Sequence, residues 1–154
     1  MFSLDGLRVS GFTGFRRLLT LDTASVPTDG GVYVVLADPA VVSRFLPVSV
    51  GGHHKGKDPT VENSVLHSNW VDNCTIVYIG KANRLQSRLR QYRNFGQGKP
   101  VPHWGGRLIW QLENHADLIV CWRTTTEEPR QVEESMLAAF EIHYGRLPFA
   151  NLSH

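Results

Sequence analysis

The sequence has no long hydrophobic run, only two cysteines and no strong excess of charge of either sign. Its longest apolar stretch, around Val32 to Ala37, is far shorter than the roughly 20 residues of a membrane-spanning helix, so we expect no membrane segment. Cys74 and Cys121 lack CxxC spacing and lie in strand-like apolar contexts, which predicts reduced core thiols. The chain does not start with a basic segment followed by an apolar stretch, and we expect a cytoplasmic protein.

The chain is long enough for one globular domain over residues 1–154, because a domain of this size buries roughly two thirds of its unfolded surface. The net charge is only +2, but no Asp or Glu occurs from Lys81 to Leu112. Aromatic residues interleave there with basic ones, namely Lys81, Arg84, Arg88, Arg90, Arg93, Lys99 and Arg107. This pattern resembles a phosphate-facing patch, although a solvated basic face remains the alternative.

Strand-like and helix-like segments follow one another along the chain. Apolar runs predict strands at 31–37, 75–79 and 116–124, and helical periodicity predicts helices over 83–95 and from Pro129 to Gly145. Residues 104–113 fit either pattern and are interpreted as a short helix. Residues 1–28 are interpreted as an irregular N-terminal extension.

Residues 38–73 fit regular structure poorly and form a predicted insertion between the first two strands. It would contain a short helix over 40–45 and a helical turn over 62–67. Its segment GGHHKGK, from Gly51 to Lys57, is close to a phosphate-binding loop. However, Asp58 occupies the place of the Ser or Thr that would bind magnesium, and Pro59 disfavours the helix that should follow. A basic loop that touches a DNA backbone is the preferred interpretation, since insertions of this length are usually functional.

Helical spacing singles out one carboxylate group and one guanidinium group. Glu133 falls on the centre of the apolar stripe of the last helix, with Leu137 and Phe140, whereas Glu134 falls on its polar side. A carboxylate in that position must be paired, hydrogen-bonded, metal-bound, protonated or left wet by a frayed first turn. Arg88 lies at the border of an apolar helix face, where its planar fork suits a phosphate, although a surface arginine without a role is commoner.

Tyrosine and glycine occur in mirror order in the first two predicted strands, as Gly31-Val32-Tyr33 and Tyr78-Ile79-Gly80. These motifs, then Arg88 eight residues after Gly80, then Glu133, and finally Asn151 in the closing PFAN make the chain resemble the GIY-YIG nuclease superfamily. Valine replaces the middle isoleucine of the first motif, and residues 34–77 separate two tyrosines that the family usually joins by a short hairpin.

The resemblance implies an α/β (α+β) fold, with a small antiparallel central sheet of about three strands flanked by helices. It implies that both tyrosines, Arg88 and Glu133 converge on one face and hydrolyse phosphodiester bonds in DNA. Glu133 would hold a single Mg²⁺ or Mn²⁺, Tyr78 would act as general base directly or by orienting water, Arg88 would neutralise charge in the transition state, and Tyr33 would position the nucleophile. Because the reference pKa of tyrosine is about 10, Tyr78 would need nearby positive charge to act as a base near neutrality.

Further residues are assigned by the same resemblance. His103 occupies a position where some relatives carry a catalytic-site histidine. The basic stretch described above adds expected nucleic-acid contacts from Lys81, Arg84, Arg90 and Arg93, and the resemblance adds Asn151, which would also support the site, with Gly31 and Gly80 as the structural glycines of the motifs. Single-stranded DNA, duplex DNA and RNA all remain open as substrates. The alternative function is a nucleic-acid-binding module that has the fold but does not cut.

Overall fold

A computed structural model describes residues 2–41 and 44–152. Its strands are β1 (Thr13–Arg17), β2 (Gly31–Leu36), β3 (Ile76–Ala82) and β4 (Ile119–Thr124). Its α-helices are α1 (Leu4–Val9), α2 (Asn63–Asn69), α3 (Leu85–Gly96) and α4 (Pro129–Tyr144), and its 3₁₀ helices are η1 (Thr23–Ser25), η2 (Trp104–Gln111) and η3 (His115–Asp117). None of the helices in these described ranges is long and apolar enough to cross a membrane.

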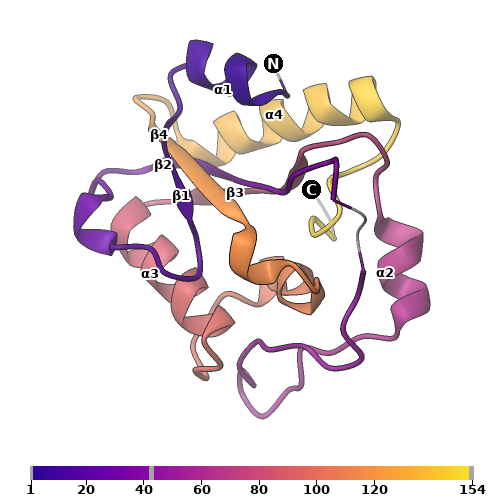
Figure 1. Cartoon of the computed structure of the whole chain (residues 1–154). Coiled ribbons are helices and arrows are strands. Elements are labelled where there is room, and N and C mark those ends of the chain that lie inside the picture. Colours follow the sequence, from indigo (N-terminus) through magenta and orange to yellow (C-terminus); the bar gives the residue numbers. More distant parts are fainter. Residues whose placement is uncertain (1, 42–43, 153–154) are drawn as a thin grey trace.

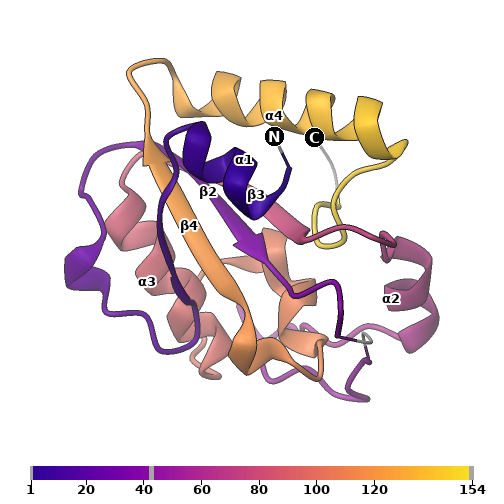
Figure 2. The same cartoon turned by 45° about the horizontal axis from the view of Figure 1, so that its top comes forward.

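The strands form one open antiparallel sheet in the order β1-β4-β2-β3, which confirms the predicted α+β class. Helix α4 covers one face of the sheet and α3 covers the other, as Figures 1 and 2 show. The core is divided accordingly. Val34, Ile79 and Phe140 belong to the cluster on the α4 side, and Tyr33 and Leu89 belong to the cluster on the α3 side.

The prediction of about three strands was wrong by one, because β1 lies in the segment predicted to be irregular. This strand, TGFRR, has no apolar alternation, and Phe15 adopts a φ of 55° at a bulge between Gly14 and Arg16. Gly14 is needed there because a Cβ would lie 2.5 Å from the ring of Trp122 on β4. The bulge and the glycine that let β1 fit the sheet also interrupt its apolar pattern, so the sequence does not predict this strand.

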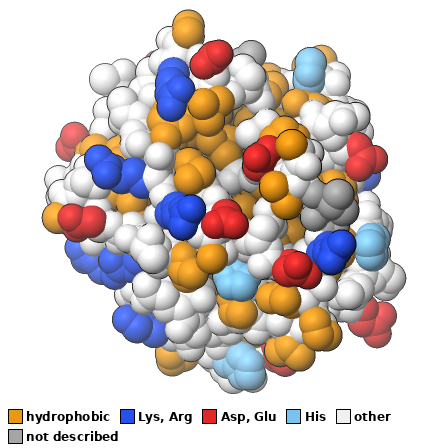
Figure 3. Space-filling view, viewed as in Figure 1, with side chains coloured by type: hydrophobic (Ala, Val, Ile, Leu, Met, Phe, Trp, Pro, Cys, Tyr) orange, Lys and Arg blue, Asp and Glu red, His pale blue; other side chains and the backbone are white. Residues whose placement is uncertain are grey.

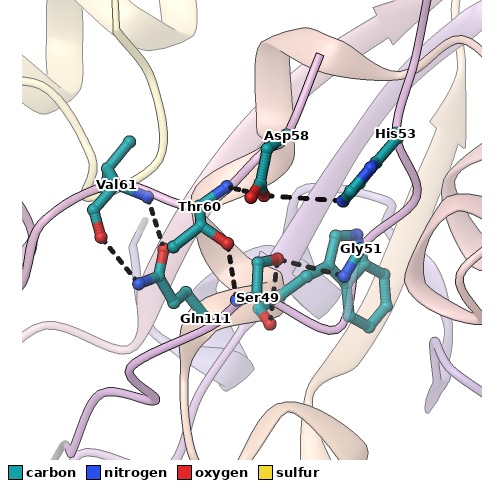
Figure 4. Close-up of polar contacts among 8 residues, drawn as sticks. Ser49, Gly51, His53, Asp58, Thr60, Val61 and Gln111 are labelled. Carbon is teal, nitrogen blue, oxygen red and sulfur yellow. Dashed lines mark hydrogen bonds and ion pairs between the residues drawn. The ribbon is translucent and has the colours of Figure 1, made fainter. Parts of the chain in front are cut away.

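The insertion between β2 and β3 is held against the domain by backbone bonds, such as that from the Val50 amide to the Trp110 carbonyl oxygen, and by the buried side chain of Gln111. Gln111 accepts a hydrogen bond from the Val61 amide and donates to the carbonyls of Val61 and Leu46. Ser49 and Thr60 add a second layer, in which Thr60 Oγ1 accepts from the Ser49 amide at 3.0 Å, as Figure 4 shows. Both ends of residues 46–61 are thus held against η2.

Helices within and around the insertion follow the predictions in part. The predicted turn over 62–67 is found as α2, with a slightly later end. The predicted helix over 40–45 includes residues 42 and 43, which lie outside the described residues, and Phe45 forms an isolated bridge with Leu112. The short helix interpreted at 104–113 is the 3₁₀ helix η2. Cys74 and Cys121 are buried free thiols, as predicted.

The two helices that flank the site begin where the chain supplies partners for their ends. The first amides of α3, those of Leu85 and Gln86, donate to the carbonyls of Asp29 and Pro27, so the turn before β2 caps this helix. Helix α4 has Pro129 in its first turn and ends at Gly145 in the left-handed conformation, as the sequence predicts.

Candidate active site

A cleft of about 400 Å³ opens at the C-terminal end of β3, between the beginnings of α3 and α4. Its lining is mostly charged and consists of Lys81, Ala82, Asn83, Arg88, Glu128 and Arg130. Because β3 is an edge strand of the sheet, residues from both faces can meet beside it. This edge is where the predicted site residues come together.

The two motifs pack against each other through their register. Tyr33 on β2 pairs with Gly80 on β3, and the ring of Tyr33 covers this glycine so closely that a Cβ on Gly80 would lie 2.4 Å from its Cζ. Gly31 is constrained in a similar way, since its Cβ would lie 2.1 Å from the carbonyl oxygen of Arg123. Gly80 was predicted at the end of its strand, but β3 continues to Ala82. The motif glycines therefore provide space for an aromatic ring and a neighbouring backbone.

Four aromatic side chains form a buried cluster around Tyr33. The ring centroids of Tyr33 and Tyr78 are 6.1 Å apart, and the ring of Tyr92 lies 5.6 Å from that of Tyr78. His103 stacks on Tyr92 with parallel rings 3.5 Å apart, and its Nε2 lies 2.6 Å from the hydroxyl oxygen of Tyr33. Tyr92 was not predicted as a site residue, because the sequence shows it only as part of the apolar face of α3.

Burial differs among these aromatic groups and limits what each can contact. Tyr33 is 1% exposed and His103 is 0% exposed, whereas Tyr78 is 8% exposed. Tyr78 is therefore the member of this cluster that can contact a substrate or its water, and its hydroxyl oxygen would lie 3.7 Å from a Cβ on exposed Gly105. Tyr33 and His103 can act only through their neighbours.

Burial also sets the protonation of the tyrosines. Desolvation raises the pKa of Tyr78 to about 12, and the opposing effect of the Arg88 charge is smaller. Burial likewise raises the pKa of Tyr33 well above its usual value. Both hydroxyls are therefore neutral near pH 7, and the positive charge of Arg88 does not by itself make Tyr78 a phenolate.

Arg88 lies half-buried along the cleft, as its place at the border of an apolar face predicted. Its Nη1 donates to Oε1 of Gln91 at 3.0 Å and makes a longer contact of 3.5 Å with the Pro102 carbonyl oxygen. The charge of Arg88 acts on Tyr33, Tyr78 and His103. A guanidinium held in this way keeps donors available for an anionic oxygen.

Glu133 is half-buried in α4, whereas Glu134 is exposed and pairs with Arg130 at 3.2 Å. The inward placement of Glu133 thus agrees with the helical periodicity. The expected convergence on one face is wrong in one respect, because α4 packs on the opposite face of the sheet from Tyr33 and Tyr78. The Glu133 charge still acts on both tyrosines, so the groups meet at the sheet edge.

The Glu133 carboxylate makes no hydrogen bond and no ion pair within 4.0 Å among residues 2–41 and 44–152. Its pKa is raised mainly by desolvation, and the charges of Lys81 and Arg130 oppose this increase. The same described ranges contain no group of three His, Cys, Asp or Glu side chains that could hold a metal. A hard cation that keeps several waters and takes one carboxylate fits this donor set.

The predicted nucleic-acid contacts divide into two groups. Lys81 and Arg84 are exposed beside the cleft, at the end of β3 and the start of α3. Arg90 instead donates to Thr23, and Arg93 donates to the Leu21 carbonyl oxygen at 2.9 Å, so these two hold the N-terminal segment onto α3. On the face of the molecule shown in Figure 3, basic and acidic side chains are interspersed.

Asn151 closes the outer edge of β3. Its Oδ1 accepts from the Ile79 amide and its Nδ2 donates to the Ile79 carbonyl oxygen, both at 2.9 Å. The neighbouring Ala150 amide donates to the Val77 carbonyl oxygen at 2.8 Å. Asn151 therefore supports the strand that carries Tyr78. Its side-chain amide is engaged with backbone and does not present a free surface to nucleic acid.

A comparison of the chain with protein-family models, with curated proteins and with solved structures finds no match. The resemblance to GIY-YIG nucleases consequently depends on the motif residues and on the geometry described above.

Proposed function

We propose that this protein is a divalent-metal-dependent endonuclease of the GIY-YIG type that hydrolyses phosphodiester bonds in DNA. The observation that carries the proposal is that the charges of Arg88 and of an unpaired, half-buried Glu133 both act on Tyr78 across one edge of the sheet. A structural carboxylate in that position would be expected to have a hydrogen-bond or ion-pair partner.

Each group has a role that follows from its surroundings. Tyr78 is neutral and reachable, so its hydroxyl oxygen accepts a hydrogen bond from the attacking water and orients it. Arg88 donates to the phosphate oxygens on which negative charge grows. Glu133 holds Mg²⁺ or Mn²⁺ together with water ligands. When bound, the ion supplies Lewis-acid stabilisation of the phosphate and of the leaving oxygen.

The direct test is a cleavage screen with Mg²⁺ or Mn²⁺ over duplex, single-stranded and branched DNA and over RNA. We expect at least one DNA form to be nicked or cut. The variant E133Q should reduce the rate by at least about 100-fold, since it removes the charged ligand that retains the ion. E134Q is the matched control, because Glu134 neighbours Glu133 but points to solvent, and its rate should stay within about twofold of wild type.

Three outcomes would contradict the proposal. Survival of every substrate at high enzyme concentration would refute nuclease activity. An unchanged rate in E133Q would place the metal elsewhere. Binding that weakens with salt but never yields product would identify a nucleic-acid-binding module instead.

A further inference from the structure

Residues 102–105, just before and within the start of η2, pass beside both Arg88 and Tyr78. Arg88 Nη1 lies 3.5 Å from the Pro102 carbonyl oxygen, and a Cβ on Gly105 would lie 3.7 Å from the Tyr78 hydroxyl oxygen. Gly105 is exposed and has no side chain, so it leaves the space beside that hydroxyl open. Trp104 directly precedes Gly105. A strand that reaches Tyr78 therefore passes within one residue of Trp104.

Trp104 is one of the two partly exposed tryptophans of the chain. Of the four tryptophans, Trp110 is 0% exposed and Trp122 is 4% exposed, so neither ring can meet a ligand. Trp70 is partly exposed, but it lies at the end of α2 in the insertion. Trp104 is thus the accessible indole of the segment that borders the site.

Arg107 stacks on this indole. Its Cζ lies over the Trp104 ring, 4.5 Å from the centroid, and its Nη1 donates to the Trp104 carbonyl oxygen at 3.0 Å. The buried ring of Phe95 contacts the indole edge-on, with centroids 6.4 Å apart. Trp104 and Arg107 are therefore held as one stacked pair, which we call the stacking platform.

The guanidinium of the stacking platform lacks a counter-charge. Within the described ranges, Arg107 has no carboxylate within 4.0 Å. It is half-buried, and desolvation lowers its pKa. A partly desolvated cation without a partner is costly, and an anion bound beside it would offset that cost. The platform thus combines a flat surface with a charge that suits a phosphate, which are the two parts of a nucleotide.

We propose that Trp104 and Arg107 bind one nucleobase of an unpaired DNA strand by stacking, next to the phosphate that is cut. Bases of any identity stack on aromatic rings and on guanidinium planes. A base inside a duplex is already stacked and paired, so it must leave the helix before it can bind in this way. Single-stranded or locally unpaired DNA is therefore the substrate class. The proposal rests on the proposed nuclease function only for the position of the phosphate that is cut.

Binding is measured by fluorescence anisotropy in EDTA, so that no strand is cut. The probes are a labelled oligothymidylate of about 20 nucleotides, the same strand annealed to its complement, and an abasic strand of equal length. We expect the oligothymidylate to bind at least about fivefold more tightly than the other two, since it alone offers free bases. A duplex or an abasic strand that binds as tightly as the oligothymidylate would overturn the proposal.

Variants separate stacking from charge. W104A should weaken oligothymidylate binding by about 5-fold to 150-fold and leave the abasic strand unaffected, because only the base contact is lost. W104F keeps an aromatic plane and should recover most of that loss. R107K keeps the charge but not the planar group, and should weaken oligothymidylate binding by about 2-fold to 5-fold.

W70A is the matched control, since it removes the other partly exposed indole, and its binding should equal that of wild type. Circular dichroism checks that each variant is folded. Equal losses in W104A and W70A, or in W104A and W104F, would overturn the proposal.

A measurement on the wild-type protein covers the case in which W104A does not fold. Oligothymidylate with 5-iododeoxyuridine at single positions crosslinks to stacked aromatic side chains under ultraviolet light, and mass spectrometry identifies the peptide. We expect the crosslink at Trp104. A crosslink at Trp70 instead, or none at any position, would overturn the proposal.

Cleavage distinguishes this proposal from the nuclease function. A protein that cuts DNA but binds oligothymidylate equally well as wild type and as W104A would keep its nuclease function and lose the stacking platform. A protein that cuts nothing but loses oligothymidylate binding in W104A would support the stacking platform and refute the nuclease function.

Discussion

The substitution Gly80→Ala tests the packing of the two motifs most sharply. Gly80 faces Tyr33 across the β2–β3 pair, and a Cβ there would lie 2.4 Å from Cζ and 2.6 Å from the hydroxyl oxygen of Tyr33. Real contacts of this kind are about 3.5–4.0 Å, so the ring must move by more than 1 Å. It has little freedom to move, because it is 1% exposed and bonded to His103.

The cost can be estimated from three contributions. Overpacking a core costs about 1–3 kcal/mol, and loss of the hydrogen bond between Tyr33 and His103 adds about 1 kcal/mol. Replacing glycine by alanine restricts the unfolded chain and returns about 0.4–1 kcal/mol. We therefore expect Gly80→Ala to lower the free energy of unfolding by about 1–3.6 kcal/mol, and to lower Tm by about 2–14 °C.

Equilibrium unfolding in urea, followed by tryptophan fluorescence, measures this change. Gly105→Ala is the control, since its Cβ would make only an ordinary 3.7 Å contact, and its stability should stay within about 0.5 kcal/mol of wild type. In a double-mutant cycle, Tyr33→Val should relieve the clash, so that the double variant is more stable than the sum of the single changes predicts by at least about 1 kcal/mol. Additive effects, or a stable Gly80→Ala variant, would refute the packing argument.

Three more predictions concern the supports of the site. Asn151→Ala removes two hydrogen bonds to Ile79 and should destabilise the protein by about 1–3 kcal/mol in the same assay, and Asn151→Asp should not rescue it because a carboxylate cannot donate to the Ile79 carbonyl. Gln111→Ala leaves buried backbone groups unpaired, and limited proteolysis should then cut residues 46–61 at least about tenfold faster. Burial holds the pKa of Tyr78 at about 12, so the unfolded chain loses the Tyr78 proton at lower pH than the folded chain does. The contribution of Tyr78 to the free energy of unfolding is therefore complete below about pH 10 and is lost as pH rises from about 10 to 12. Unfolding measured at a series of pH values tests this.

The parts of the site that the sequence predicted are those set by local periodicity. Helical spacing alone placed Glu133 inward and Glu134 outward, and Pro129 with Gly145 marked the ends of α4. These features depend on residues within one helix. They are visible in the sequence because a period of 3.6 residues assigns each side chain to a face.

The remaining features depend on contacts between segments that are far apart in the chain. The role of Gly80 follows from its register with Tyr33, and the bond between Tyr33 and His103 joins β2 to the loop before η2. The engagement of Asn151 with Ile79 is another contact of this kind. A single sequence carries no signal for such pairings, and the resemblance that placed Glu133 on the same face as the tyrosines did not show that α4 packs on the other side of the sheet.

The closure of β3 by the C-terminal segment has a consequence for how the molecule behaves among its own copies. An edge strand with unpaired amides and carbonyls is a template for strands of other molecules, and natural sheets protect such edges against aggregation. Here Ala150 and Asn151 occupy the middle of that template. The opposite edge, β1, is interrupted by the bulge at Phe15 and carries Arg16 and Arg17. Both edge strands of the sheet are therefore poor partners for intermolecular pairing. The edge strand that carries Tyr78 pairs only with segments of its own chain.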